Sequence, residues 1–129
     1  MKFTVILTDK VASIPGLSQG LRVRVDDSLI FFTGQMGINT EFKLQDETFA
    51  VEARQALTNV KHLLAGADCT FDDVVHVSVK LSGSLDDWDE LKGILKEYFG
   101  QHEPTRDLPE VVVALPANAR VSISVIAAK

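Results

Sequence analysis

Arg106 is the residue of this sequence whose setting best suits the binding of an anion. It lies between Pro104 and Pro109, on a short polar segment that leads into an apolar run at residues 110–115. Proline fixes φ near about −65° and has no amide hydrogen, so two prolines stiffen the chain around the arginine. A guanidinium held in this way can donate two parallel hydrogen bonds to one carboxylate. The alternative is a solvated surface arginine at the start of a strand, because most arginines are exposed.

The other residues with reactive side chains form no recognisable motif. His62, His76 and His102 are too scattered along the chain to indicate metal-ligand spacing. Cys69 is the single cysteine, in a polar loop without a basic neighbour that would lower its pKa. No phosphate-binding glycine loop or serine-nucleophile elbow occurs. We therefore expect neither a metal nor an organic cofactor.

Length and composition indicate one soluble domain covering residues 1–129. Apolar residues make up 46% of the 129 residues and charged residues 24%, which is enough to form a core without disulfides. The net charge of −5 argues against a protein that binds the phosphate backbone of nucleic acids. No signal peptide and no apolar run of membrane-spanning length is apparent, so a cytoplasmic location is expected.

A helix of about five turns is the element that the sequence predicts most clearly. Apolar residues between 49 and 64 recur at spacings of three and four, which places them in one stripe. Asp46 is the predicted N-cap and Gly66 the predicted end. The opposite face carries Glu52, Asn59 and Lys61, which are expected to be exposed to solvent.

A second helix and a set of strands complete the predicted elements. Ser84 and Asp87 have the spacing of a capping box, and Gly100 is a natural end for the helix that follows. Asp26 and Asp27 indicate a tight turn that would join two strands into a hairpin. Strands are predicted from alternating or continuous apolar residues at 3–8, 21–25, 28–33, 75–81, 110–115 and 121–125.

The order of these elements predicts an α+β fold. Because helices follow only the third and fourth strands, we expect a single mixed sheet with both helices on one face. The other face would then be uncovered. An uncovered face of this extent favours self-association.

The sequence resembles the RidA/YjgF family, the reactive imine/enamine deaminases that were earlier described as endoribonuclease L-PSP proteins. The similar segments keep the family's order and spacing over nearly the whole chain. They are residues 15–19, 32–35, 53–60, 72–79, 98–99 and 104–116.

The resemblance implies a chorismate-mutase-like fold and a homotrimer with three clefts between subunits. It implies that Arg106 anchors the carboxylate of a small 2-imino or 2-enamino acid. Thr33 and Gly34 would contribute at the turn after the third strand, and the backbone of Leu108 would accept a hydrogen bond from the imine nitrogen. Leu17 and Trp88 would supply apolar walls near the ligand.

Several positions depart from the family pattern. Leu17 stands where the family usually has a tyrosine, and Ser122 stands where deaminating members have an acidic residue on the last strand. Both remain candidate substrate-binding positions. A hydroxyl group cannot replace a carboxylate as a general base at neutral pH. Asp107 and Glu110 are candidates for a relocated acid–base group.

Three functions follow from these observations. The first is hydrolysis of a small imine or enamine to a carbonyl compound and ammonia, with Arg106 as the carboxylate anchor. The second is a non-catalytic trimer that binds small carboxylates, which the serine at position 122 favours. The third is ribonuclease activity. The acidic balance of the chain and the lack of a His/Lys acid–base pair near Arg106 argue against it.

Overall fold

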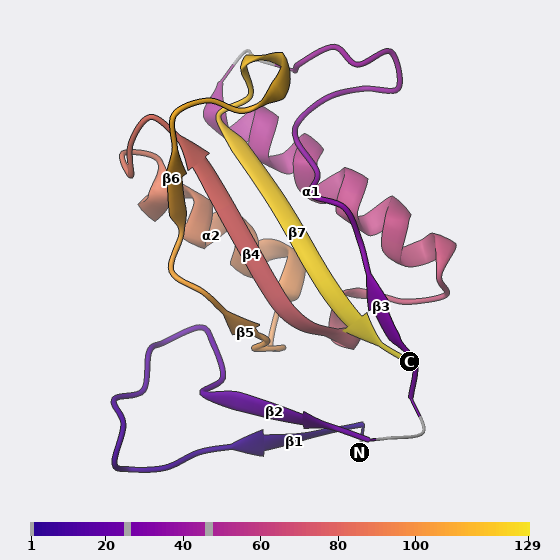
Figure 1. The fold of residues 1–129 in the computed structure, drawn as a ribbon, viewed down its shortest axis with the longest axis vertical. Coiled ribbons are helices and arrows are strands. Elements are labelled where there is room, and N and C mark those ends of the chain that lie inside the picture. Colours follow the sequence, from indigo (N-terminus) through magenta and orange to yellow (C-terminus); the bar gives the residue numbers. More distant parts are fainter. Residues whose placement is uncertain (1, 25–26, 46–47) are drawn as a thin grey trace.

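The structure, a computed structural model, describes residues 2–24, 27–45 and 48–129. Figure 1 shows a central sheet backed by two helices, with a separate pair of strands below it. The helices are α1 (Phe49–Gly66) and α2 (Trp88–Phe99), and the short 3-10 helices are η1 (Phe71–Asp73) and η2 (Pro116–Asn118). The strands are β1 (Phe3–Ile6), β2 (Gly20–Val23), β3 (Leu29–Phe31), β4 (Val74–Ser82), β5 (Thr105–Arg106), β6 (Glu110–Val112) and β7 (Val121–Ala128).

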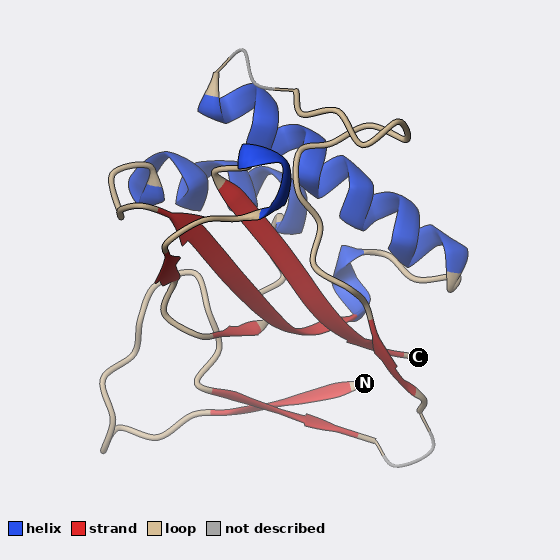
Figure 2. Cartoon of the chain, turned by 45° about the horizontal axis from the view of Figure 1, so that its top comes forward, coloured by secondary structure: helices blue, strands red, loops and turns tan. Residues whose placement is uncertain are grey.

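The long strands β4 and β7 form the centre of a five-stranded sheet. They run antiparallel, with a register from Val74↔Ala127 to Leu81↔Val121. The edge strand β3 pairs antiparallel with β7, whereas β5 and β6 both pair parallel with β4. Both helices lie on the same side of β4 and β7 (Figures 1 and 2). This arrangement confirms the α+β class, the mixed sheet and the placement of both helices on one face.

The prediction of one continuous sheet is wrong, because β1 and β2 form a two-stranded sheet of their own. Their register runs from Phe3↔Val23 to Ile6↔Gly20. The predicted hairpin between residues 21–25 and 28–33 therefore does not form. The backbone of Ser28 instead exchanges hydrogen bonds of 3.0 Å with Lys129, which extends the pairing of β3 with β7.

The error has a simple physical origin. Alternation of apolar and polar residues shows which side of a strand is buried, but it does not name the strand that pairs with it. Of the two predicted turn residues, Asp26 lies outside the described residues, and Asp27 begins the next described segment.

The core lies between the helices and one face of the five-stranded sheet. Alternate residues of β4 and β7 point into it, and the apolar stripe of α1 covers them. The fully buried side chains include Leu57, Leu64, Leu81, Leu91 and Ile123. Burial of each such side chain stabilises the fold by about 1.5–3 kcal/mol. Within the described residues, no helix is long and apolar enough to cross a membrane.

Glu52 is fully buried, contrary to the prediction that it faces solvent. Its Oε1 accepts a 2.7 Å hydrogen bond from Nε of Arg120, and its Oε2 accepts one of the same length from the backbone nitrogen of Arg120. The pair joins α1 to the start of β7. Gly37 packs directly on the same turn of α1, since a Cβ there would lie 2.4 Å from the carbonyl oxygen of Glu52.

Both helices begin later than the sequence pattern predicts. Thr48 caps α1, with its Oγ1 accepting a hydrogen bond of 3.1 Å from the backbone nitrogen of Val51, while Asp46 lies outside the described residues. The predicted capping box at Ser84 and Asp87 does not form. The hydroxyl of Ser84 instead accepts from the backbone nitrogen of Asp86 in a turn, and α2 starts at Trp88. A serine hydroxyl before an apolar run can accept a hydrogen bond from a nearby backbone N–H in a turn as well as at a helix N-terminus.

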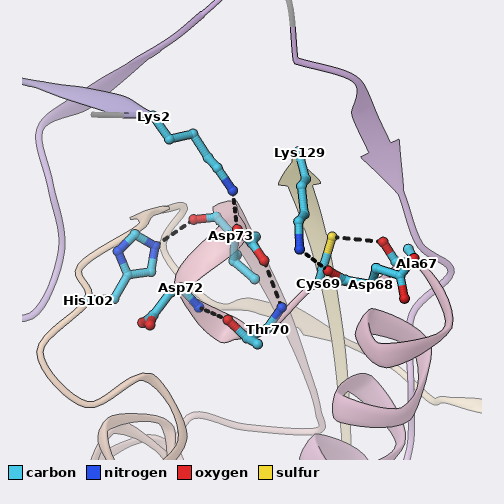
Figure 3. A network of polar contacts seen from close by, with 10 residues as sticks. Lys2, Ala67, Asp68, Cys69, Thr70, Asp72, Asp73, His102 and Lys129 are labelled. Carbon is cyan, nitrogen blue, oxygen red and sulfur yellow. Dashed lines mark hydrogen bonds and ion pairs between the residues drawn. The ribbon is translucent and has the colours of Figure 1, made fainter.

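The β1–β2 pair is attached to the rest of the chain at both of its ends. Lys2 pairs with Asp73 of η1, whose other carboxylate oxygen accepts from the backbone nitrogen of Thr70 at 2.8 Å (Figure 3). At the far end of the pair, Ser18 donates its backbone N–H to the carbonyl of Pro104 at 3.2 Å. These contacts bring the loop at residues 8–19 close to the segment that carries Arg106.

Candidate functional site

Arg106 lies on the helix side of the sheet. It pairs in parallel register with Val77 of β4, which is buried beneath the helices. The guanidinium stacks on the indole ring of Trp88 at the start of α2, with Cζ 4.6 Å from the ring centroid. Cation–π stacking of this kind holds the guanidinium plane in place and leaves its hydrogen-bond donors available at the edge. Trp88 is thus close to the arginine, and its expected role as an apolar wall beside a ligand remains a prediction.

The guanidinium opens onto a cleft of about 460 Å³. The cleft lies between the second half of α2, the segment that follows this helix, and the tip of the 8–19 loop. Its lining residues are Pro15, Gly16, Val77, Lys92, Gly93, Leu95, Lys96, Phe99, Gly100, Gln101, His102, Glu103, Pro104 and Arg106. A volume in this range suits a small organic molecule.

The electrostatics of the cleft favour an anion. Arg106 is partly buried, and burial lowers the pKa of its guanidinium, although an arginine remains protonated at neutral pH. Within the described part of the chain, no carboxylate forms an ion pair with it. The charge of Arg106 is therefore partly desolvated, and no described carboxylate compensates it by an ion pair. A bound carboxylate would supply both missing features, charge and hydrogen-bond acceptors.

His102 borders the same cleft with a defined tautomer. Its Nε2 lies 2.7 Å from the carbonyl oxygen of Val74, and since a carbonyl only accepts, Nε2 carries the hydrogen. Figure 3 shows the other ring nitrogen turned away from that carbonyl. The neutral ring then has its lone pair on Nδ1. Glu103, the next residue, is the cleft's only carboxylate among the described residues.

A second polar cluster lies on the opposite face of the sheet from Arg106. The hydroxyl of Thr105 donates to the carbonyl of Val75 at 2.8 Å and so accepts from Nδ1 of His76, also at 2.8 Å. Nε2 of His76 lies 3.2 Å from Oδ2 of Asp107. Asp107 is thus engaged with His76, on the face of the sheet opposite to α1 and α2.

The turn at Thr33 and Gly34 also lies on that open face. Gln35 and Ile123 exchange backbone hydrogen bonds of 2.8 and 2.9 Å, which hold the turn beside β7 at the edge of the sheet. A Cβ on Gly34 would lie 2.7 Å from the hydroxyl oxygen of Ser122, so only glycine permits this close approach without movement of the serine.

Glu110 lies in the same row of the open face as Ser122, but two strands away. Ser122 is opposite Lys80, and Lys80 is opposite Glu110. Neighbouring strands are about 4.8 Å apart, so the carboxylate of Glu110 does not occupy the position of Ser122. Neither of the two proposed replacement acids, Asp107 or Glu110, lines the cleft at Arg106.

A single copy of the chain therefore does not bring all the predicted site residues together. Thr33, Gly34 and Ser122 lie across the sheet from the Arg106 cleft. Leu17 lines a neighbouring cleft of about 740 Å³ beside the β1–β2 pair, which shares Pro15, Gln101, His102 and Glu103 with the first. Leu108 is 82% exposed and lines neither cleft. The ligand contacts of these residues remain predictions.

Sequence reasoning missed Lys92, Lys96 and His102 as cleft residues. The two lysines have the helical spacing of four residues on the flank of α2, next to Leu95 and Phe99 of the apolar stripe, and by pattern alone this indicates only solvent exposure. Cys69, in contrast, lines neither cleft, and burial raises the pKa of its thiol, which makes it a poor nucleophile.

Comparison with known proteins places the chain in a family. The model of the endoribonuclease L-PSP family matches residues 8–129. The 2-iminobutanoate/2-iminopropanoate deaminase of Bos taurus is 36% identical over 117 residues, which cover 90% of this chain and 82% of the relative.

Solved structures support the same assignment. RidA from the Antarctic bacterium Psychrobacter sp. is 29% identical and superposes with a TM-score of 0.71, covering 96% of this chain and 98% of that one. A protein of unknown function of the conserved Rid family from Yersinia pestis is 20% identical and superposes with a TM-score of 0.87. The match covers both chains completely and shows that they share a fold. The chain belongs to the endoribonuclease L-PSP family, the RidA/YjgF family that its sequence motifs indicate.

Proposed function

We propose that this protein hydrolyses small 2-imino acids, and the enamines from which they form, to 2-oxo acids and ammonia. The observation that carries the proposal is the guanidinium of Arg106, which is partly desolvated, stacked on Trp88, unpaired among the described residues and open to a cleft. Relatives that are 36% identical carry the name of 2-iminobutanoate/2-iminopropanoate deaminases.

In the proposed reaction, Arg106 binds the substrate carboxylate through two parallel hydrogen bonds. The fixed cation orients the C=N bond next to the carboxylate, and positioning of this kind supplies much of a catalytic effect. Water adds to the imine carbon, the nitrogen gains a proton, and the carbinolamine then expels ammonia as the C=O bond forms. The net change is imine plus water to ketone plus ammonia.

The proton of the attacking water needs an acceptor on the cleft side of the sheet. Nδ1 of His102 is suited to this role, because Nε2–H is held by the carbonyl of Val74. Replacement by Gln, which keeps a donor for that carbonyl, is expected to slow ammonia release at least about tenfold while changing the Kd of 2-oxobutanoate less than about twofold. Unchanged turnover would assign the proton to another group, and the carboxylate of Glu103, which also lines the cleft, is the alternative.

The family resemblance and the open sheet face together support a homotrimer with clefts between subunits. Phe31 and Leu29 are 71% and 55% exposed on this face, where a monomer would leave them in water. A neighbouring copy can bring a second set of side chains, including the turn at Thr33 and Gly34, to the edge of the sheet near Arg106. The proposed site is then completed by two subunits.

The function is tested by ammonia release from 2-iminobutanoate, generated in the assay from threonine by a dehydratase. The purified protein is expected to accelerate ammonia release above the rate in buffer, and a deaminase of the family serves as the positive control. If that control is active and this protein is not, the catalytic proposal is wrong.

A non-catalytic carboxylate-binding trimer is the second candidate. It is favoured by Ser122, which lies on the last strand where deaminating members carry an acid. Loss of binding in Arg106→Gln is expected under both candidates, so that variant does not separate them. Binding of 2-oxobutanoate without turnover of the imine would establish the second function.

A further inference from the structure

The cleft at Arg106 is cationic in a protein that is acidic as a whole. The chain carries a net charge of −5, yet three permanent cations line the cleft, Lys92, Lys96 and Arg106, against one carboxylate, Glu103. A single monocarboxylate bound to Arg106 would leave both lysines without an anionic partner from the ligand. The cleft therefore holds more positive charge than one ligand carboxylate would neutralise.

Lys92 and Lys96 line the same cleft as Arg106. They are four residues apart on α2, which puts them on one face of the helix about 6 Å apart along its axis. Nζ of Lys92 lies 5.9 Å from the centroid of Trp88, the same ring on which Cζ of Arg106 stacks at 4.6 Å. Between the lysines, Gly93 leaves the wall open, because a Cβ there would meet no atom within 4 Å.

Neither lysine is strongly held by the protein itself. Nζ of Lys92 lies 3.1 Å from Oδ1 of Asp89, but that carboxylate is 92% exposed and the pair lies within one turn of the helix. Exposed pairs of this kind are weak and are readily exchanged for another anion. Lys96 forms no ion pair with a carboxylate among the described residues.

From this arrangement we infer that the cleft selects a dianionic substrate, a 2-imino dicarboxylic acid, over a monocarboxylic one. This inference rests on the proposed function. Arg106 binds the carboxylate next to the imine carbon, and the ammonium groups of Lys92 and Lys96 attract the second carboxylate at the other end of the molecule. Hydrolysis then gives a 2-oxo dicarboxylic acid and ammonia.

The inference is tested with the stable 2-oxo acid products as ligands of the full chain. The Kd values of 2-oxoglutarate and 2-oxobutanoate are measured by calorimetry at low and high salt. We expect 2-oxoglutarate to bind about tenfold more tightly at low ionic strength, from a few-fold contribution of each lysine. The preference should shrink at high salt, because exposed charges are screened.

Single-charge variants locate the source of the preference. Lys92→Gln and Lys96→Gln are each expected to weaken 2-oxoglutarate about threefold to fivefold and to leave 2-oxobutanoate within about twofold. Lys61→Gln, on the exposed surface of α1 and outside the cleft, changes the net charge equally and should affect neither ligand.

The possible failures are distinguishable. Equal affinities for the two ligands, or equal losses for both in the cleft variants, would overturn the dianion preference while leaving the Arg106 site intact. If wild-type protein bound neither ligand, the proposed function itself would be wrong, and the inference with it.

Discussion

The two faces of the five-stranded sheet carry polar residues in different settings. On the helix side, Arg106 lies in a cleft, stacked on an indole and without a carboxylate partner among the described residues. On the open side, His76 contacts Thr105 through one ring nitrogen and Asp107 through the other, and Ser122 lies next to Gly34.

The difference shows how adjacent residues on a strand can serve separate purposes. Thr105 and Arg106 are neighbours in sequence, but successive side chains of a strand point to opposite faces. Thr105 therefore satisfies its hydrogen bonds with β4, whereas Arg106 is left with donors that face a cleft. Unsatisfied donors beside a cleft are typical of a binding site, and satisfied ones of a structural contact.

The largest effect, a loss of ligand affinity, is expected from substitution of Arg106 on the helix side. Arg106→Gln removes two charge-assisted hydrogen bonds to the ligand carboxylate, each worth about 1.5–3 kcal/mol, so the Kd of 2-oxobutanoate should rise at least about a hundredfold. Arg106→Lys keeps the charge without the planar fork and should give an intermediate loss. If calorimetry found Arg106→Gln unchanged, the distinction drawn between the two faces would be lost.

A buried pair on the helix side should matter more for stability than any polar residue of the open face. Glu52→Gln leaves the guanidinium of Arg120 without its counter-charge, at a cost of about 2 kcal/mol, reduced from the value for fully buried pairs because Arg120 is partly exposed. Urea unfolding measures the difference. Ser124→Ala, on the open face, is the matched control, for which a change within about 0.5 kcal/mol is expected.

The open face is expected to act in assembly instead. Phe31→Asp puts a charge where we propose that copies pack together, so the variant should be monomeric at concentrations where we expect the wild-type protein to be a trimer. Light scattering after size-exclusion chromatography gives the mass directly. A trimer that persists in Phe31→Asp, or a wild-type monomer, would contradict this role for the face.

The smallest effect concerns Asp73, which joins η1 to the N-terminal strand. Burial raises the pKa of its carboxyl, but the hydrogen bonds from Lys2 and Thr70 outweigh burial and leave the pKa below its usual value. Stability from this group is thus present above the ordinary carboxyl pKa and is lost as the pH falls through the lowered value. Urea unfolding should show that the free energy of unfolding falls between pH 6 and about pH 3. We expect this fall to be smaller in Lys2→Met than in the wild-type protein, by less than about 1 kcal/mol. Identical pH profiles would show that Lys2 does not stabilise the carboxylate.

The helices and the central strands could be predicted from sequence because packing against one core imposes a period on their residues. The stripe of α1 and the alternation in β4 and β7 are direct consequences. Glu52 escaped this reasoning, since a charged residue on the polar side of a helix is ordinarily solvated. The burial of Glu52 is explained by the position of Arg120 in the folded chain, which the sequence pattern does not show.

The partner of β2 and the surroundings of Arg106 could not be predicted for the same reason. Both depend on which distant segments meet. The pattern of prolines around Arg106 indicated a stiff anion-binding segment, and Trp88 was expected nearby. The sequence motifs did not show that Thr33, Gly34 and Ser122 lie across the sheet, because motif order says nothing about which face a residue occupies.

The central claim is that Arg106 grips a carboxylate from the helix side of the sheet, next to Trp88. A crystal structure of the protein with 2-oxobutanoate tests this claim most directly. We predict two hydrogen bonds between the ligand carboxylate and the guanidinium of Arg106, with the indole of Trp88 still stacked against it. A ligand bound elsewhere, or an Arg106 paired with a carboxylate of a neighbouring copy, would contradict the account.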